Sequence, residues 1–192
     1  MIAHLLAALL GGFAWTLAEY LLHRFNGHGL KGRTRFSRLH LQHHADILWF
    51  APTSEKLRVA AVVVPPLALG GWFAVGAAGL TFAAGFGLVY GAYEVLHRRI
   101  HTHAPRTAYG RWACRHHLYH HFKAPQMNHG VTTSLWDHVF RTHVPVGRLV
   151  VPARQAMPWL LDAEGDVKAA FRETYEVGRR GRAAAQPERA AA

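Results

Sequence analysis

The sequence predicts an all-α integral membrane protein, a helical bundle of about three spans with a cytoplasmic, histidine-rich helical cap. Three observations lead to this prediction. Residues 2–18 and 59–93 contain no Asp, Glu, Lys or Arg, and about 20 apolar residues are enough for a helix to cross a bilayer. Basic residues flank both stretches. All sixteen histidines except His4 follow the first stretch.

The first apolar stretch predicts one span over about residues 2–23. It has neither the basic start nor the small-residue cleavage site of a secretory signal, so we expect it to be retained. The second stretch is 35 residues long, or roughly 52 Å as a helix, against a hydrocarbon core of about 30 Å. It therefore predicts two tight spans, over about 57–73 and 78–97, with Pro65-Pro66 favouring a kink or turn. A water-soluble core hairpin is the alternative interpretation.

The basic residues orient the predicted spans. They lie on the flanks that join the spans to the histidine-rich segments: Arg24, Lys31, Arg33, Arg35, Arg38, Lys56, Arg58, Arg98 and Arg99. By the positive-inside rule these flanks face the cytoplasm, so the N-terminus and the uncharged hairpin tip near 74–77 lie outside. The net charge of +11 then describes a membrane-facing layer. We expect no nucleic-acid partner, because no recognisable binding module is present.

One membrane-bound domain is expected over residues 1–163. A polar tail, expected to be largely disordered, follows over residues 164–192. The chain ends in "GRRGRAAAQPERAAA", a low-complexity sequence that lacks the apolar residues needed for a core. The single Cys114 excludes an intrachain disulfide and a cysteine-rich metal site.

The histidines fall into two sets, each after an apolar block. The first set is "HRFNGH" followed by "HLQHH", and the second is "HRRIH" followed by "HLYHH". Positions i, i+3 and i+4 share one helical face, so each H-x-x-H-H presents three imidazoles together. The candidate metal ligands are therefore His23, His28, His40, His43, His44, His97, His101, His117, His120 and His121.

Topology supports a shared site for the two sets. Two predicted crossings separate His44 from His97, so both sets return to one membrane face. His23 and His28 are five residues apart, about 140° around a regular helix. We expect Asn26-Gly27 to end the helix and let His28 turn back.

The number and spacing of these histidines narrow the kind of metal site. A zinc protease needs H-E-x-x-H, whereas "HRRIH" places Arg98 at the Glu position. A haem pair would need histidines buried on opposed spans. A structural zinc site needs four ligands, and ten ligands suit two metal ions. A non-catalytic membrane metal-binding protein remains an open alternative.

The order of the boxes resembles that of the membrane fatty-acid hydroxylase and sterol desaturase superfamily. The segment "NHGVTTSLWDHVFRT", residues 128–142, is similar to the corresponding segment of fatty-acid 2-hydroxylases. The resemblance covers about residues 15–143. Two departures are Arg141, where Gly is usual, and Thr102, which interrupts what is often a paired His.

The resemblance implies a non-haem di-iron monooxygenase that uses O2 and two electrons to hydroxylate a lipid acyl chain, with its active site on the cytoplasmic face. Its partners would be the bilayer, a lipid substrate and a separate electron-donor protein or reductase. Hydroxylation or desaturation of a carotenoid or sterol by the same superfamily is the alternative. No catalytic residue beyond the metal ligands is implied.

Other polar residues lie near the boxes. Four carboxylates are candidates for orienting the imidazoles: Glu19, Asp46, Glu94 and Asp137. Further ligands remain possible at His103, His116, His129, His138 and Asn128. An ordinary structural role is at least as expected for each of these five.

Overall fold

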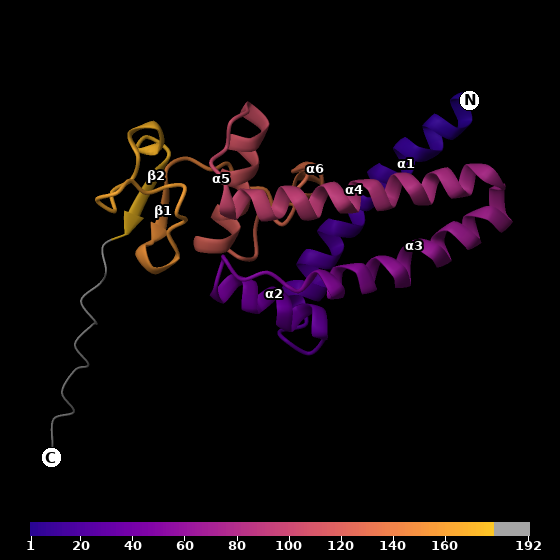
Figure 1. The fold of residues 1–192 in the computed structure, drawn as a ribbon, viewed down its shortest axis with the longest axis horizontal. Helices are drawn as coiled ribbons and strands as arrows, with labels where there is room; N and C mark the ends of the chain where they lie inside the picture. The colour runs from indigo at the N-terminus through magenta and orange to yellow at the C-terminus, as the bar shows by residue number, and fades with distance from the viewer. Residues whose placement is uncertain (179–192) are drawn as a thin grey trace, which may run out of the picture.

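A computed structural model describes residues 1–178 of the chain and confirms an α-helical membrane bundle (Figure 1). Three helical segments are long and apolar enough to cross a membrane, Ile2–Gly29, Thr53–Val75 and Ala77–Thr102. The first comprises α1 (Ile2–Leu21) and a π-helical turn, and the other two are α3 and α4. Each contains the span that the sequence predicts, extended by a few residues at one or both ends.

The turn between the second and third spans lies at Gly76, within the hairpin tip expected near residues 74–77. Helix α3 continues through Pro65 and Pro66. Gly76 ends α3 with φ of 64°, a left-handed conformation that glycine adopts without a Cβ penalty. Helix α4 starts at the next residue, which makes α3 and α4 a close antiparallel hairpin (Figure 1).

Glycines bring α1 and α4 together. A Cβ at Gly85 of α4 would lie 2.0 Å from the carbonyl oxygen of Ala8, and a Cβ at Gly11 of α1 would lie 1.9 Å from that of Phe82. The two backbones therefore touch at a crossing that no larger residue allows. Small residues are the usual means of close helix packing in membranes, where lipid offers no hydrophobic driving force.

Gly85→Val is expected to separate α1 from α4 and lower thermal stability, because the new side chain meets backbone that cannot rotate away. The cost should be at least the roughly 1–3 kcal/mol of an overpacked core. Gly91→Val is the matched control on the same helix, since a Cβ there meets nothing within 4 Å. Equal unfolding temperatures of the two purified variants would contradict this account of the crossing.

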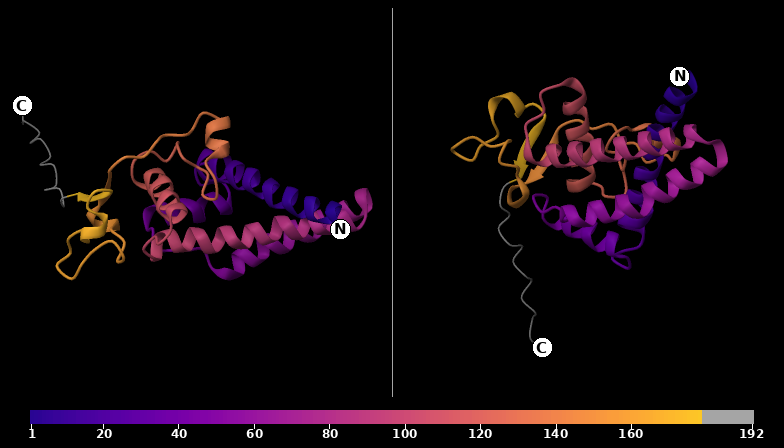
Figure 2. Two further views of the ribbon diagram at one scale, coloured as in Figure 1. Left: turned by 90° about the horizontal axis from the view of Figure 1, so that it is seen from above. Right: turned by 45° about the vertical axis from the view of Figure 1, so that its right-hand side comes forward.

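The cap lies at the end of the bundle where α1 and α4 finish (Figure 2). It contains α2 (Arg35–Ala45), α5 (Ala108–Phe122) and the short α6 (Leu135–Val139). Two threonines begin its longer helices by accepting backbone N–H groups: Thr34 Oγ1 from Ser37 at 3.1 Å, and Thr107 Oγ1 from Gly110 at 3.0 Å. Such caps fix where a helix starts, and therefore where its histidines point.

Residues 149–178, here called the C-terminal unit, form a folded segment that extends past the expected domain boundary at residue 163. Strand β1 (Leu149–Pro152) pairs in parallel with β2 (Tyr175–Gly178), and 3-10 turns lie at Ala153–Gln155 and Ala169–Phe171. Residues 164–178 are thus part of a folded unit, because Phe171, Tyr175 and Val177 pack on one core with Trp159. The remainder of the expected tail, residues 179–192, lies outside the described residues.

Arg141 has φ of 58°, in the left-handed region that costs a residue with a side chain roughly 1–2 kcal/mol. The sequence departs from its family resemblance at this position, where Gly is usual. Arg141→Gly is therefore expected to raise stability by about 0.5–1 kcal/mol, after the entropy cost of glycine in the unfolded chain. A lower unfolding temperature for the purified variant would show that the guanidinium outweighs the backbone strain.

Candidate metal centre

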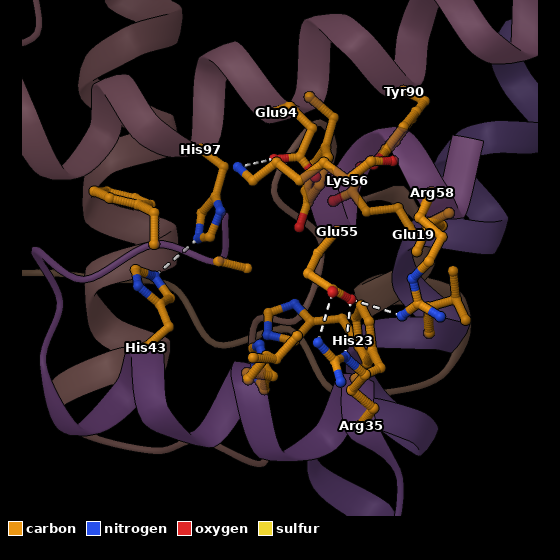
Figure 3. A pocket seen from close by; sticks show the side chains of 18 of the residues that line it. Glu19, His23, Arg35, His43, Glu55, Lys56, Arg58, Tyr90, Glu94 and His97 are labelled. Atoms are coloured by element: carbon orange, nitrogen blue, oxygen red, sulfur yellow. Dashed lines mark hydrogen bonds and ion pairs between the residues drawn. The ribbon is translucent and has the colours of Figure 1, made fainter. Parts of the chain in front are cut away.

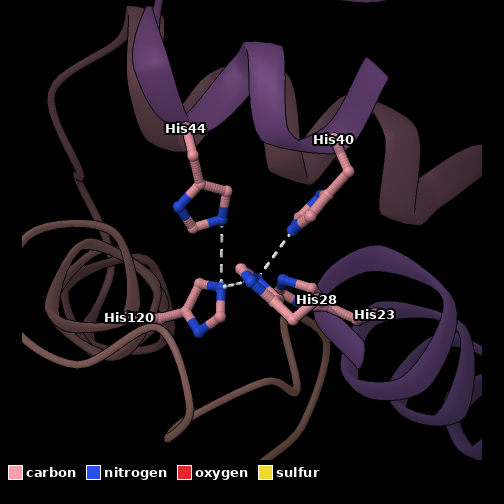
Figure 4. A group of neighbouring side chains, drawn as sticks. All are labelled: His23, His28, His40, His44 and His120. Atoms are coloured by element: carbon pink, nitrogen blue, oxygen red, sulfur yellow. Dashed lines mark hydrogen bonds between the residues drawn. The ribbon is translucent and has the colours of Figure 1, made fainter. Parts of the chain in front are cut away.

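The structure brings all ten candidate histidines together in two groups of five. Within each group the ligand atoms lie within 4.8 Å of one another. The first group is His23, His28, His40, His44 and His120 (Figure 4), and the second group is His43, His97, His101, His117 and His121. Residues from both predicted sets are present in each group, so the expectation of one shared membrane face is met.

Helices α2 and α5 each supply both groups. His40 and His44 of α2 belong to the first group and His43 to the second. Of the three candidate ligands on α5, His120 belongs to the first group, and His117 and His121 belong to the second. The spacing predicts that the three imidazoles of each H-x-x-H-H lie on one face. The structure refines this prediction, because neighbouring positions on that face point to different groups.

A π-helical turn, Leu22–Gly29, places His23 beside His28. This corrects the expectation that Asn26-Gly27 would end the helix. A π-helix closes i→i+5 hydrogen bonds, so residues five apart stand one above the other and no reversal of the chain is needed. The two ring centroids lie 5.4 Å apart. Gly27 leaves room for α2, since a Cβ there would lie 2.9 Å from His40.

One imidazole in each group neighbours the other four. The ring centroid of His28 lies 4.5–5.4 Å from those of the rest of the first group, whereas His40 and His120 are 6.4 Å apart on opposite sides. His101 holds the same central place in the second group, at 4.6–5.2 Å. In each group the rings are arranged as a square pyramid with the central ring at its apex.

Backbone carbonyls set the tautomers of three of these rings. Nδ1 of His43 donates to the carbonyl of Trp49 at 2.8 Å, and Nδ1 of His120 donates to that of Met127 at 2.8 Å. Nδ1 of His23 donates to the carbonyl of His129. A carbonyl can only accept, so a neutral ring held this way carries its proton on Nδ1. Its Nε2 is then a bare lone pair directed at the group.

The converging Nε2 atoms fit a bound cation. Nε2 of His120 lies 2.9 Å from that of His28 and 3.2 Å from that of His44, and Nε2 of His43 lies 3.1 Å from that of His97. Nε2 of His23 is buried without a hydrogen-bond partner among residues 1–178. Where both nitrogens of such a pair carry lone pairs they repel one another, and a positive ion between them removes that repulsion. Five imidazoles suit zinc, copper, iron or nickel.

Burial keeps the cap histidines neutral, which is the form of the imidazole that binds metal. Loss of water lowers the pKa of His43 to about 4. Burial likewise lowers the pKa values of four others, and neighbouring imidazoles lower them further: His40, His117, His120 and His121. All five rings are therefore neutral near pH 7, as metal coordination requires.

The four carboxylates do not orient these rings, contrary to expectation. Asp137 accepts from His116 at 3.1 Å, and Glu19 accepts from the side chain of Thr132 at 2.6 Å. Glu94 pairs with Lys56, and Asp46 accepts from the backbone of Leu48. The carbonyls take the orienting role instead. Any residue provides a carbonyl, so no sequence signal could have found them.

The residues left open as further ligands lie outside both groups. His116 bonds to Asp137, His103 to Thr102, and Asn128 to the backbone of Val144. His138 stacks on another cap histidine at 3.9 Å. His129 is fully buried next to the first group, with its ring centroid 5.3 Å from that of His120, but it is not one of the five.

A cavity of about 160 Å³ reaches both groups. Histidines of the first and second groups line it together: His23, His40, His43 and His97. Figure 3 labels three of them, His23, His43 and His97. Ion pairs border it, because Glu55 accepts from Arg35 at 2.6 Å and from Arg58 at 2.6 Å, and Lys56 pairs with Glu94. The three cations thereby pair with two carboxylates, Glu55 and Glu94.

An apolar groove adjoins the cavity. It is about 620 Å³ in volume, and α1 and α3 supply most of its lining. Four residues line both spaces: Trp15, Leu22, Val59 and Tyr90. The groove lies between the first span and α3. Fold and site together define a membrane protein with two candidate metal positions next to an apolar groove.

Comparisons with known proteins agree with this class. Residues 8–142 match the family model described as fatty acid hydroxylase. The chain is 33% identical over 141 residues to a dihydroceramide fatty acyl 2-hydroxylase of Arabidopsis thaliana, covering 69% of this chain and 58% of that protein. It is 31% identical over 154 residues to a fatty acid 2-hydroxylase of Homo sapiens, covering 71% of this chain and 39% of that protein.

A solved structure is also similar. Full-length scs7p, of which only the hydroxylase domain is visible, matches with a TM-score of 0.52 and 28% identity, covering 73% of this chain and 57% of that one. The chain belongs to the fatty acid hydroxylase family, as the box order predicts. It spans between two fifths and three fifths of the length of these relatives.

Proposed function

We propose that the chain is an O2-dependent di-iron oxidoreductase that hydroxylates a lipid acyl chain, near its carboxyl end. The observation that carries the proposal is the pair of five-imidazole groups beside one cavity, in a family of fatty acid hydroxylases. Hydroxylation of a C–H bond by O2 takes up two electrons and two protons and releases water. Iron would supply that redox chemistry, which zinc lacks.

The chain's own residues would bind and orient the substrate. The acyl chain would lie in the apolar groove between α1 and α3, with its polar end in the cavity bordered by the ion pairs of Glu55 and Glu94. Trp15 and Tyr90, shared by both spaces, would then lie beside the carbons next to the carboxyl end. A short reach from the interface to the metals favours oxidation there over oxidation at the far end of the chain.

Electrons would come from a separate carrier protein, and the exposed Arg and Lys side chains of the cap suit an acidic surface on that carrier.

The site would face the cytoplasm, since basic residues flank the cap ends of the spans while the tip near Gly76 has none.

Cysteine labelling tests the orientation. In a Cys114→Ser background, a cysteine at Ala74 beside the hairpin tip should react with an impermeant maleimide added to intact cells. A cysteine at Arg33, exposed next to the cap, should react only after lysis, because the reagent cannot reach the cytoplasm. The reverse pattern would overturn the orientation, and with it the cytoplasmic site.

Lipid analysis tests the reaction. The protein should be produced in a host that contains both acyl lipids and carotenoids, with the His120→Ala variant as control, and extracts analysed by mass spectrometry. We expect 2-hydroxylated acyl chains with the intact protein alone. Hydroxylated carotenoid without altered acyl chains would replace the proposed substrate. Bound metal with no oxidised lipid of any kind would favour the non-catalytic metal-binding alternative.

A further inference from the structure

We propose that the C-terminal unit positions the metal-binding histidines, with Gln155 and Trp159 as its positioning residues. The inference rests on the metal occupancy proposed above. It concerns a part of the chain outside the family match, which ends at residue 142, whereas the unit begins at residue 149. Its basis is a set of hydrogen bonds from the unit to the ends of two histidine-bearing helices.

Gln155 donates hydrogen bonds to the backbone carbonyls at the end of α2. The last four carbonyls of a helix have no partner within the helix. Nε2 of Gln155 donates to the carbonyls of His44 at 3.1 Å and Ala45 at 2.9 Å. These are the final residues of the helix that carries His43 and His44. One amide therefore holds the end of the element that supplies histidines to both groups.

Trp159 performs the same role at the end of α4. Its indole N–H donates to the carbonyl of His101 at 3.2 Å, in a bond closed off from solvent. His101 belongs to the last turn of α4, and its ring is the central one of the second group. A shift of this turn would move the one imidazole that neighbours all four others.

The unit is rigid enough to position these ends. Trp159 is 7% exposed and packs against Phe171 and Tyr175, with ring centroids 5.3 and 6.0 Å away. The same core includes Ile100 and Leu118, which are the chain neighbours of His101 and His117. The two hydrogen bonds therefore come from a packed body that is continuous with the metal-binding helices.

Two conservative variants separate positioning from simple packing. Gln155→Met keeps the length of the side chain and loses both donated bonds. Trp159→Phe keeps an aromatic ring in the core and loses the indole N–H. Arg172→Met is the matched control, since Arg172 belongs to the same unit and its exposed side chain, within residues 1–178, donates to the carbonyl of Val167 and pairs with Asp162, away from the histidine-bearing helices.

The test uses the full-length chain in detergent, loaded with Co2+ in place of iron. Cobalt per chain, its visible absorption bands and its release to a chelator are measured for wild type and the three variants. We expect wild type to bind two ions. In Trp159→Phe the bands should change and one of the two ions should leave about tenfold faster, the lower end of the effect of groups that orient metal ligands. Gln155→Met should speed the release of both ions, and Arg172→Met should match wild type.

The outcomes are distinguishable. Purely structural bonds would lower the unfolding temperature yet leave the absorption bands and release rates of loaded protein at wild-type values, and that result would overturn the inference while leaving the proposed function intact. A wild-type chain that binds no cobalt or iron would remove both. Gln155 is only partly buried, so its variant remains informative even if Trp159→Phe does not fold.

Discussion

His120→Ala is expected to abolish hydroxylase activity and to empty the first group of metal. Nε2 of His120 lies 2.9 Å from that of His28 and 3.2 Å from that of His44, and its Nδ1 is held by the carbonyl of Met127. The substitution removes one of the five converging imidazoles and leaves a cavity beside the other four. The loss should exceed the roughly 10–100-fold that follows removal of a group that only orients a ligand.

Metal analysis by mass spectrometry and lipid hydroxylation in cell extracts measure these two effects. His103→Ala is the matched control, because His103 is an exposed cap histidine that bonds to Thr102 and belongs to neither group. It should keep both ions and full activity. If His120→Ala retained wild-type turnover, the assignment of the first group to catalysis would be wrong.

Asp137→Ala is expected to have the largest effect on stability, about 3–5 kcal/mol, because it leaves several buried donors without an acceptor. Asp137 has no exposed surface. It accepts from the backbone N–H of His129 at 2.8 Å and of Gly130 at 2.9 Å, and from the side chains of Thr142 and His116. Thermal unfolding in detergent should show the loss, with Asp137→Asn intermediate because one acceptor oxygen remains.

The same residue predicts a pH dependence. Burial alone would raise the pKa of Asp137, but hydrogen bonds from His116, Thr142 and Gly130 hold it below its ordinary value. A carboxyl whose pKa is lower in the folded state stabilises the fold above its unfolded pKa of about 3.9. That contribution is lost as pH falls through the lower folded value. Wild type should therefore lose its advantage over Asp137→Asn in acid, and a constant difference from pH 7 to pH 3 would contradict this.

Much of the fold and the whole set of converging histidines could be predicted from the sequence. Charge-free stretches identify the spans because a bilayer imposes one length and one polarity on them. The two crossings between His44 and His97 then place both sets of histidines on one face. That the ten side chains bind metal stays a prediction. The structure gives the positions of the side chains, whereas metal analysis is needed to show whether ions are bound.

Other features could not be predicted, for specific physical reasons. The division of α2 between two groups depends on the relative positions of α1, α4 and α5, which no local pattern encodes. The C-terminal unit could not be predicted because Phe171, Tyr175 and Val177 are scattered among charged residues and form a core only together with distant residues such as Ile100 and Leu118. The π-helical turn could not be predicted because its sequence, "LHRFNGHG", contains a pair, Asn-Gly, that more often ends a helix.

That turn changes what histidine spacing means in such chains. His97 and His101, four apart, meet on an ordinary α-helix, whereas His23 and His28, five apart, meet only because the backbone there is wound more loosely. The interval between two histidines at the end of a span thus reports the local winding of the backbone. A chain that gained one residue between His97 and His101 could keep that pair together only by acquiring a π turn of its own. Two histidines can therefore be brought together at an interval of four residues on an α-helix or of five residues on a π-helix. The interval determines which of the two helix types the surrounding backbone must adopt.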